Sequence, residues 1–110
     1  LIARAQGGFT ELEATSPIIG LADDCEYEEA EVPFAGGDVV CFYTDGIIEA
    51  RDASDRLFDV AGVKASLQAS MSGSLEAMAD GIVTDLIQFM KEPYFEDDIT
   101  VLLGQTIESL

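Results

Sequence analysis

The chain has 110 residues, 48% of them hydrophobic, and a formal net charge of -17 from 22 acidic and 5 basic residues. This length allows one small domain with a modest core, and the hydrophobic content excludes a disordered tail. The acidic balance argues against nucleic acid and anionic membranes as partners, because no basic stripe is present to neutralise phosphates.

The first third of the chain has the pattern of short strands. Residues 1–5 and 9–13 predict a hairpin in which Gly7 and Gly8 form the turn. Residues 27–34 alternate glutamate with apolar side chains, which predicts a strand with one solvated face. The chain starts without methionine inside an expected strand, so we interpret it as a piece of a longer protein.

The most informative run is GDVVCFYTDGIIEARD, residues 37–52, where an apolar strand ends on an Asp-Gly pair. Residues 39–43 place β-branched or aromatic side chains on both faces of the pleat, which predicts a strand covered by protein on both sides. Asp45 is then expected at the end of this strand. Taken alone, Asp45 is interpreted as an ordinary turn residue, because Asp-Gly is a common turn pair.

A second acidic position changes that interpretation. Asp97 and Asp98 directly precede another apolar run, residues 99–103. If the two strands are antiparallel neighbours, about 4.8 Å apart, the end of one lies beside the start of the other. The carboxylates would then converge at one edge of the sheet, in the manner that hard divalent cations require.

Two helices are expected between these acidic positions. Apolar side chains recur at helical spacing over residues 60–71, with Asp59 as N-cap, and over residues 75–90, with Ser74 as N-cap. Pro93 is expected to stop the second helix. Strands followed by a helix pair and one returning strand predict an α+β fold with mostly antiparallel strands.

The blocks YTDGIIEARD and FEDDITVLL resemble the last two signature blocks of the PPM (PP2C-type) metal-dependent serine/threonine phosphatases. They are most similar to the bacterial sporulation and stress-response branch related to SpoIIE and RsbU. The segment SPIIGLADDCEYEEAEVPFAGGD takes the place of that branch's Pro-x-x-Gly turn, hairpin and Gly-Asp turn. The resemblance covers essentially the whole chain but only the later part of the family's domain. It implies that residues 1–110 are the C-terminal portion of one phosphatase domain, the later half of an αββα sandwich.

The resemblance also implies site residues. Asp45 and Asp97 would hold the same ion, Mn²⁺ or Mg²⁺, in a two-metal centre, and would be catalytic through a metal-activated water. Gly46 and Asp98 are further candidates at the metal, with Asp98 orienting ligands or water. The family's bridging aspartate has no counterpart in this chain, so we expect these residues alone to be inactive. No substrate-binding residue is assigned.

The implied reaction is removal of phosphate from phosphoserine on an anti-sigma-factor antagonist or a similar bacterial regulator, under control of an upstream sensor or receiver domain. Two alternatives stay open: a non-catalytic interaction module derived from the same fold, and an acidic metal-binding structural domain. The lack of a signal peptide or spanning segment predicts a cytoplasmic protein. Sheet surface left uncovered by the missing half predicts self-association.

Three further features have simple interpretations. Cys41 is expected to be a buried small hydrophobe, although counting alone leaves a disulfide with Cys25 open. The acidic run at residues 23–31 lacks the spacing of a calcium loop and is interpreted as a solvated hairpin edge. Arg51 could contact a phosphate, but a solvated loop arginine is the favoured interpretation.

Overall fold

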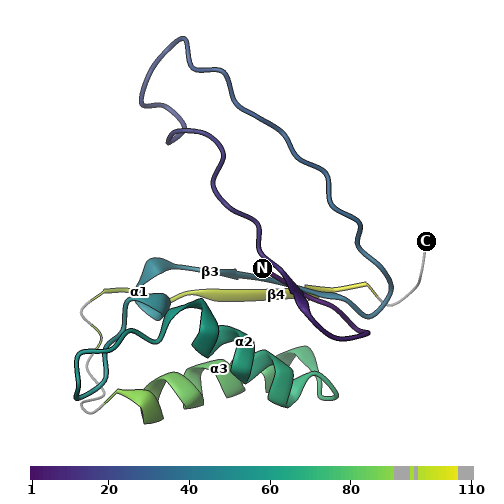
Figure 1. Ribbon diagram of the computed structural model, residues 1–110, viewed down its shortest axis with the longest axis vertical. Coiled ribbons are helices and arrows are strands. Elements are labelled where there is room, and N and C mark those ends of the chain that lie inside the picture. Colours follow the sequence, from purple (N-terminus) through teal and green to yellow (C-terminus); the bar gives the residue numbers. More distant parts are fainter. Residues whose placement is uncertain (91–94, 96, 107–110) are drawn as a thin grey trace.

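The computed structural model describes residues 1–90, 95 and 97–106. The strands of this part of the chain form one antiparallel sheet in the order β2-β1-β3-β4. Two antiparallel helices cover one face of it (Figure 1). The predicted α+β class is thus confirmed. In chain order the elements are β1 (Ile2–Ala3), β2 (Phe9–Thr10), β3 (Val39–Tyr43), α1 (Asp45–Ile48), α2 (Asp59–Ser70), α3 (Leu75–Phe89) and β4 (Val101–Gln105).

The predicted N-terminal hairpin is confirmed, with shorter strands than expected. The backbone N–H of Gly7 donates to the carbonyl of Arg4 (3.0 Å), and the backbone N–H of Arg4 donates to the carbonyl of Gly8 (2.9 Å). Both glycines have positive φ, +103° and +87°, a backbone conformation that is unfavourable for residues with a Cβ. The turn therefore begins at Arg4, which limits β1 and β2 to two residues each.

The strand predicted over residues 27–34 is wrong. Residues 11–35, here called the arm, leave the sheet on the side opposite the helices and return without forming a strand (Figure 1). The contacts between its two limbs are few: the N–H of Glu28 donates to Ser16 Oγ (2.8 Å) and the hydroxyl of Tyr27 to the Ile18 carbonyl (3.3 Å). Alternating polarity predicts the two faces of a strand, but without a neighbouring strand the ladder does not form.

The helix pair follows the predicted stripes, and one of the two predicted caps is present. Ser74 Oγ accepts the backbone N–H of Ala77 (3.1 Å), which confirms the cap of α3. The cap predicted for α2 is wrong: Phe58 is the N-cap and Asp59 is the first helical residue. The Asp59 carboxylate accepts only the N–H of the adjacent Val60 (2.7 Å). It therefore does not cap the N–H groups that follow in the first turn of α2. No helix in the described part of the chain is long and apolar enough to cross a membrane.

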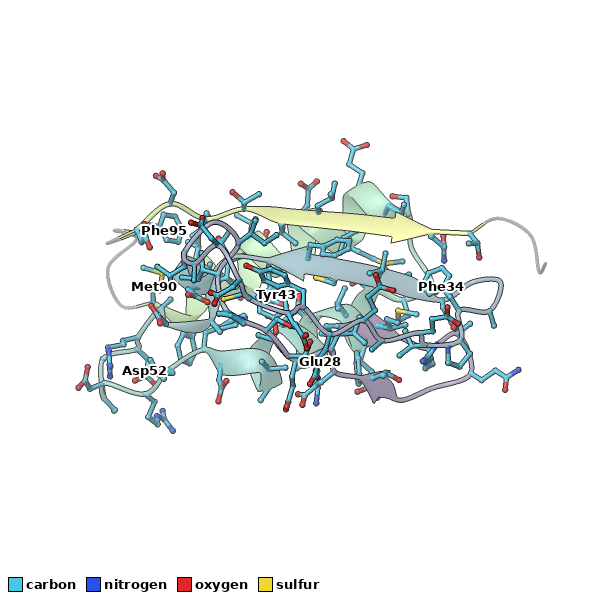
Figure 2. All side chains as sticks on the ribbon, turned by 90° about the horizontal axis from the view of Figure 1, so that it is seen from above. Glu28, Phe34, Tyr43, Asp52, Met90 and Phe95 are labelled. Atoms are coloured by element: carbon cyan, nitrogen blue, oxygen red, sulfur yellow. The ribbon has the colours of Figure 1, made fainter. Side chains whose placement is uncertain are left out.

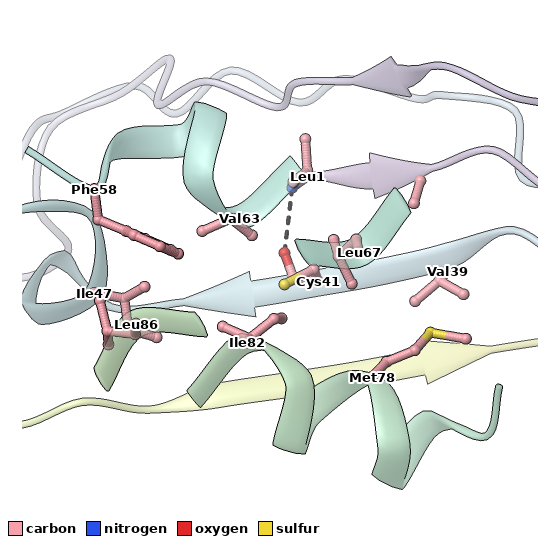
Figure 3. Close-up of a cluster of buried hydrophobic side chains, with 11 residues drawn as sticks. Leu1, Val39, Cys41, Ile47, Phe58, Val63, Leu67, Met78, Ile82 and Leu86 are labelled. Carbon is pink, nitrogen blue, oxygen red and sulfur yellow. Dashed lines mark hydrogen bonds between the residues drawn. The ribbon is translucent and has the colours of Figure 1, made fainter. Parts of the chain in front are cut away.

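The core lies between the sheet and the two helices (Figure 3). Phe58, which precedes α2, packs its ring edge-on against Phe89 of α3, with the centroids 5.3 Å apart. Cys41 is buried in β3 as predicted; both cysteines are free, and burial raises the pKa of the Cys41 thiol. The buried apolar side chains of this cluster are Leu1, Ala3, Val39, Cys41, Ile47, Phe58, Val63, Leu67, Met78, Ile82 and Leu86.

The face of the sheet opposite the helices is only partly covered. Phe42 of β3 and Leu102 of β4 are direct partners across the ladder, and both are exposed. Coverage of β3 on both sides, predicted from its composition, is therefore wrong at Phe42. The uncovered apolar surface expected from the family resemblance is present in its place.

Asp38 anchors the base of the arm. Its buried carboxylate accepts the backbone N–H of Ala5 (2.8 Å), the backbone N–H of Ala35 (2.9 Å) and the guanidinium of Arg4 (2.9 Å). Arg4 also donates to the carbonyl of Pro33 (2.6 Å). The Ala5 and Ala35 N–H groups, followed by Arg4, hold the pKa of Asp38 below its usual range. This network fixes the direction in which β3 leaves the arm.

Candidate metal centre

Two acidic loops meet at one end of the β3–β4 ladder. Tyr43 pairs with Val101 at the last position of the ladder. Asp45 follows β3 as the first residue of α1, and Asp97 and Asp98 precede β4. The predicted antiparallel neighbours, with acidic residues at the end of one strand and the start of the other, are therefore confirmed. The strand predicted over residues 99–103 is displaced by two positions, because the residues before Val101 form the turn into the ladder.

Thr44 joins the two loops, a role that was not predicted from the sequence. Its backbone N–H donates to the carbonyl of Thr100 (3.1 Å), and its Oγ1 accepts the N–H of Thr100 (3.0 Å). The same hydroxyl donates to the carbonyl of Asp98 (3.4 Å). Thr44 is also the N-cap residue of α1. A threonine between an apolar strand and an aspartate was the available signal, because its side chain can extend a ladder where the backbone begins to turn.

Gly46 brings the loops into backbone contact. A Cβ at this position would collide with the carbonyl oxygen of Asp98 and would lie 3.3 Å from a methyl group of Ile99. Gly46 is not among the positive-φ glycines, so close approach, and not a left-handed backbone, excludes a side chain there. Gly46 was predicted only as a metal-site residue. Its position shows a packing role that holds residues 46 and 98 together.

The candidate carboxylates themselves face solvent. Asp45, Asp97 and Asp98 are all exposed. One oxygen of Asp97 accepts the backbone N–H of Asp98 (2.8 Å), which fixes the local turn. None of the ion pairs found among residues 1–90, 95 and 97–106 involves these three aspartates. They are therefore accessible to a cation from solution.

The donor set fits a hard divalent cation in part. The described residues contain no group of three or more His, Cys, Asp or Glu side chains arranged around one point. Mg²⁺ commonly takes only one or two carboxylates and completes its coordination with water and substrate phosphate oxygens. Asp45 and Asp97 are of the required chemical type and lie on the two loops that meet. A two-metal centre, with its ions about 3.5–4 Å apart, is not outlined by the carboxylates of the described residues.

The loop that follows α1 is held together by its own ion pairs. Asp52 accepts the backbone N–H groups of Ser54 and Arg56 (2.9 Å each) and the Arg56 guanidinium (2.9 Å). The Arg56 N–H is the main cause of a lowered Asp52 pKa. Arg51 donates to the carbonyl of Asp55 (3.0 Å), as expected of a solvated loop arginine. Figure 2 shows Asp52 at the same end of the sheet as Phe95, which precedes the second acidic loop.

The molecule thus defines a small antiparallel α+β layer with two acidic loops joined at one end of its sheet. The family model for Stage II sporulation protein E (SpoIIE) matches residues 1–106. The chain belongs to this PP2C-like family. Comparison with curated proteins gives no match. Comparison with solved structures gives no match either.

Proposed function

We propose that this chain is the later portion of a metal-dependent protein serine/threonine phosphatase domain, with Asp45 and Asp97 as ligands of one Mn²⁺ or Mg²⁺ ion. The observation that supports this most strongly is the contact of Gly46 with the Asp98 carbonyl, because it joins the two acidic loops. Membership of the SpoIIE family agrees with the same assignment.

Each residue has a distinct part in this proposal. When bound, the metal supplies a water of lowered pKa and charge that stabilises the phosphoryl oxygens in the transition state. Asp45 and Asp97 provide anionic oxygens for the metal. Asp98 orients water or a ligand by hydrogen bonding, in the manner of residues adjacent to metal ligands. Thr44 keeps the two loops at a fixed separation.

By family resemblance the proposal also requires a bridging aspartate, which has no counterpart among the family motifs in this sequence. We therefore propose that it comes from an earlier segment of the same domain, and that residues 1–110 alone are inactive. By family resemblance the substrate is a phosphoserine of a cytoplasmic bacterial regulator, such as an anti-sigma-factor antagonist. A sensor or receiver domain upstream would control the activity.

A non-catalytic interaction module is the second candidate function. It is favoured by the exposed apolar side chains on the sheet and the arm, together with the incomplete donor set in the described residues. The two candidates differ in one requirement. A phosphatase needs the additional carboxylate, whereas a module does not.

The test uses an intact domain that contains residues 1–110. With added Mn²⁺ or Mg²⁺ it should hydrolyse a phosphoserine peptide and a chromogenic phosphomonoester, and chelator should abolish both activities. Asp45→Asn and Asp97→Asn should each reduce kcat by at least about 100-fold, because an electrostatic catalytic group commonly contributes that much. Asp98→Asn should have a smaller effect.

Asp85→Asn provides the matched control, because Asp85 is an exposed carboxylate on α3 with no place in the site. Its activity should equal that of the unmodified domain. Unchanged turnover in strong chelator would refute the metal-dependent assignment. Full activity of Asp45→Asn with all variants folded would refute the assignment of that ligand, and an inactive intact domain would favour the interaction module.

A further inference from the structure

One further loop lies at the end of the sheet that carries the candidate metal centre, and the proposed chemistry does not use it. Residues 51–57, here called the 51–57 loop, lie between α1 and α2. Figure 1 shows this segment beside α1, on the helix side of the sheet and away from the arm, and Figure 2 shows its Asp52 at the same end. By family resemblance the other sheet of the domain covers the arm side, so it leaves this loop uncovered.

The 51–57 loop is closed at its base and held in one shape. Arg51 and Leu57 form an isolated antiparallel bridge. Inside the loop, the backbone N–H of Asp52 donates to the carbonyl of Arg56 (2.9 Å). The Asp52 carboxylate also accepts the backbone N–H of Arg56 (2.9 Å). The loop is therefore ordered before a partner binds, which lowers the entropy cost of an interaction.

The loop carries the two most exposed cationic side chains in the described part of the protein. Those of Arg56 and Arg51 are 77% and 54% exposed, whereas those of Arg4 and Lys64 are no more than 33% exposed. The net charge of -17 repels acidic peptides over most of the surface. The 51–57 loop is where an acidic peptide meets cations at the metal end of the sheet.

Arg56 is displayed more effectively than Arg51, because its counter-charge is turned inward. Asp52, whose side chain is only 11% exposed, accepts hydrogen bonds from Arg56 Nε and Nη2 (2.9 Å each). This pairing fixes the guanidinium and leaves most of it in solvent. Asp55, the partner of Arg51, is by contrast 81% exposed. Next to Arg56, the apolar side chain of Leu57 is also exposed.

A peptide bound at the metal centre would reach this loop. From Asp45 to Ile48 the chain is helical and advances about 1.5 Å per residue. The next three residues add at most about 3.6 Å each, which places Arg51 within about 15 Å of Asp45. An extended peptide spans this distance in about five residues. Side chains up to about five positions from a phosphoserine held at the metal therefore come within contact distance of the loop.

We propose that the 51–57 loop binds the residues that flank the phosphoserine of the substrate protein, with Arg56 pairing with an acidic side chain and Leu57 packing against an apolar one. This inference rests on the proposed phosphatase function and adds a sequence preference to it. Arg56 and Leu57 determine specificity and take no part in the chemical step, since neither belongs to the two acidic loops. Asp52 is a positioning residue that acts through Arg56.

The test compares three substrates on an intact domain that contains residues 1–110, with Mn²⁺ present. The acidic peptide has two glutamates and a leucine on each side of a phosphoserine, within five positions of it. The basic peptide is identical except that lysines replace the glutamates. The third substrate is a chromogenic phosphomonoester, which has no flanking residues. The unmodified domain should have a higher kcat/KM for the acidic peptide than for the basic one.

Three variants of the loop separate binding from chemistry. Arg56→Gln should raise the KM for the acidic peptide about 2- to 5-fold, as expected of one exposed ion pair, and leave kcat unchanged. Leu57→Ser should raise this KM by a similar factor. Arg56→Glu should prefer the basic peptide, because the sign of the contact is exchanged. None of the three should alter hydrolysis of the chromogenic substrate.

Lys64→Gln is the matched control, since it removes a cation from α2, where Lys64 pairs with Glu11 (2.8 Å). It should leave the kinetics of all three substrates unchanged. Circular dichroism should show that every variant is folded.

Two results would overturn the inference and leave the proposed function standing. The first is an unchanged KM for the acidic peptide in both Arg56→Gln and Leu57→Ser. The second is an equal loss on the chromogenic substrate, because the loop would then support the metal centre and not the substrate. An intact domain that hydrolyses none of the three substrates would refute the proposed function, and this inference with it.

Discussion

Thr44 and Thr100 are hydrogen-bonded to each other twice, once from backbone to backbone and once from the Thr100 N–H to the Thr44 hydroxyl oxygen. These bonds continue the β3–β4 pairing for one residue beyond the regular ladder. Beyond these bonds, the segments that join β3 and β4 turn away from each other and form the two acidic loops. The separation of Asp45 from Asp97 therefore depends on this pair as well as on the strands.

The first prediction concerns the Thr44 hydroxyl. Thr44→Val keeps the shape of the side chain but removes the acceptor for the Thr100 N–H. The free energy of unfolding should fall by about 0.5–1.5 kcal/mol, the usual net contribution of one hydrogen bond. Amide exchange at Thr100 should become faster. Urea denaturation and hydrogen exchange measured by NMR would check the two effects.

Thr84→Val is the control for this substitution. Thr84 is an exposed residue within α3 and makes no hydrogen bond through its side chain in the described part of the chain. Its replacement should change stability by less than about 0.5 kcal/mol, as for most surface substitutions. Equal protection of the Thr100 amide in Thr44→Val and in the unmodified chain would contradict the role given to Thr44.

The second prediction concerns the close contact at Gly46. Gly46→Ala places a methyl group against the Asp98 carbonyl, which is backbone and cannot rotate away. The loops must separate, at a cost of about 1–3 kcal/mol, as for other overpacked sites. In an intact domain, the Mn²⁺ or Mg²⁺ concentration needed for half-maximal activity should rise as well.

Gly81→Ala tests whether this effect belongs to the site or to any glycine in the fold. A Cβ at Gly81, within α3, would meet only the hydroxyls of Ser66 and Ser70, at 3.8 and 3.9 Å. Alanine should therefore fit there and stabilise the chain by about 0.4–1 kcal/mol, because it restricts the unfolded state. A Gly46→Ala protein as stable as Gly81→Ala would show that the loops do not touch in solution.

Elements that depend on local pattern were predictable from sequence. The apolar run of β3 and the spacing of Val63 and Leu67 in α2 indicate burial directly, and both residues are buried as expected. Ser74 could be identified because an N-cap serine acts within one turn of its own helix. The start and end of β4 could not be predicted as closely, since they depend on pairing with Tyr43 and Val39 of β3, which are distant in sequence.

The site was predictable only as a pair of acidic positions. Mirror placement of Asp45 and Asp97 at strand ends indicates convergence if the strands are antiparallel. The antiparallel pairing is confirmed, and the convergence of the two carboxylates stays a prediction. The functions of Thr44 and Gly46 in joining the loops depend on which atoms face each other where the two loops meet. The sequence alone does not give these contacts. The arm was mispredicted because alternation in residues 27–34 describes side-chain polarity and not the presence of a partner strand.

The third prediction concerns the acid stability given by Asp38. Because the pKa of Asp38 is lowered in the folded state, the carboxylate stabilises the fold above its unfolded pKa of 3.8 and loses this effect as pH falls through the folded value. The difference in unfolding free energy between the unmodified chain and Asp38→Asn should be largest above about pH 5 and should shrink below pH 3.8. Urea midpoints measured from pH 2.5 to 7 would show this change.

Asp80→Asn controls for the general effect of removing a negative charge, since Asp80 is exposed on α3. Its stability difference from the unmodified chain should not follow the pH profile of Asp38→Asn. A difference for Asp38→Asn that stays constant down to pH 2.5 would show that folding does not lower the pKa of Asp38.

The central claim, that Asp45 and Asp97 form one cation site, is tested most directly by adding Mn²⁺ to the isotope-labelled chain and recording paramagnetic line broadening by NMR. The account predicts that amides of residues 44–46 and 97–98 broaden together at the lowest Mn²⁺ concentrations. Asp45→Asn should remove the effect at both loops, and Asp85→Asn at neither. Broadening confined to the acidic residues of the arm, or to one loop without the other, would contradict a shared site.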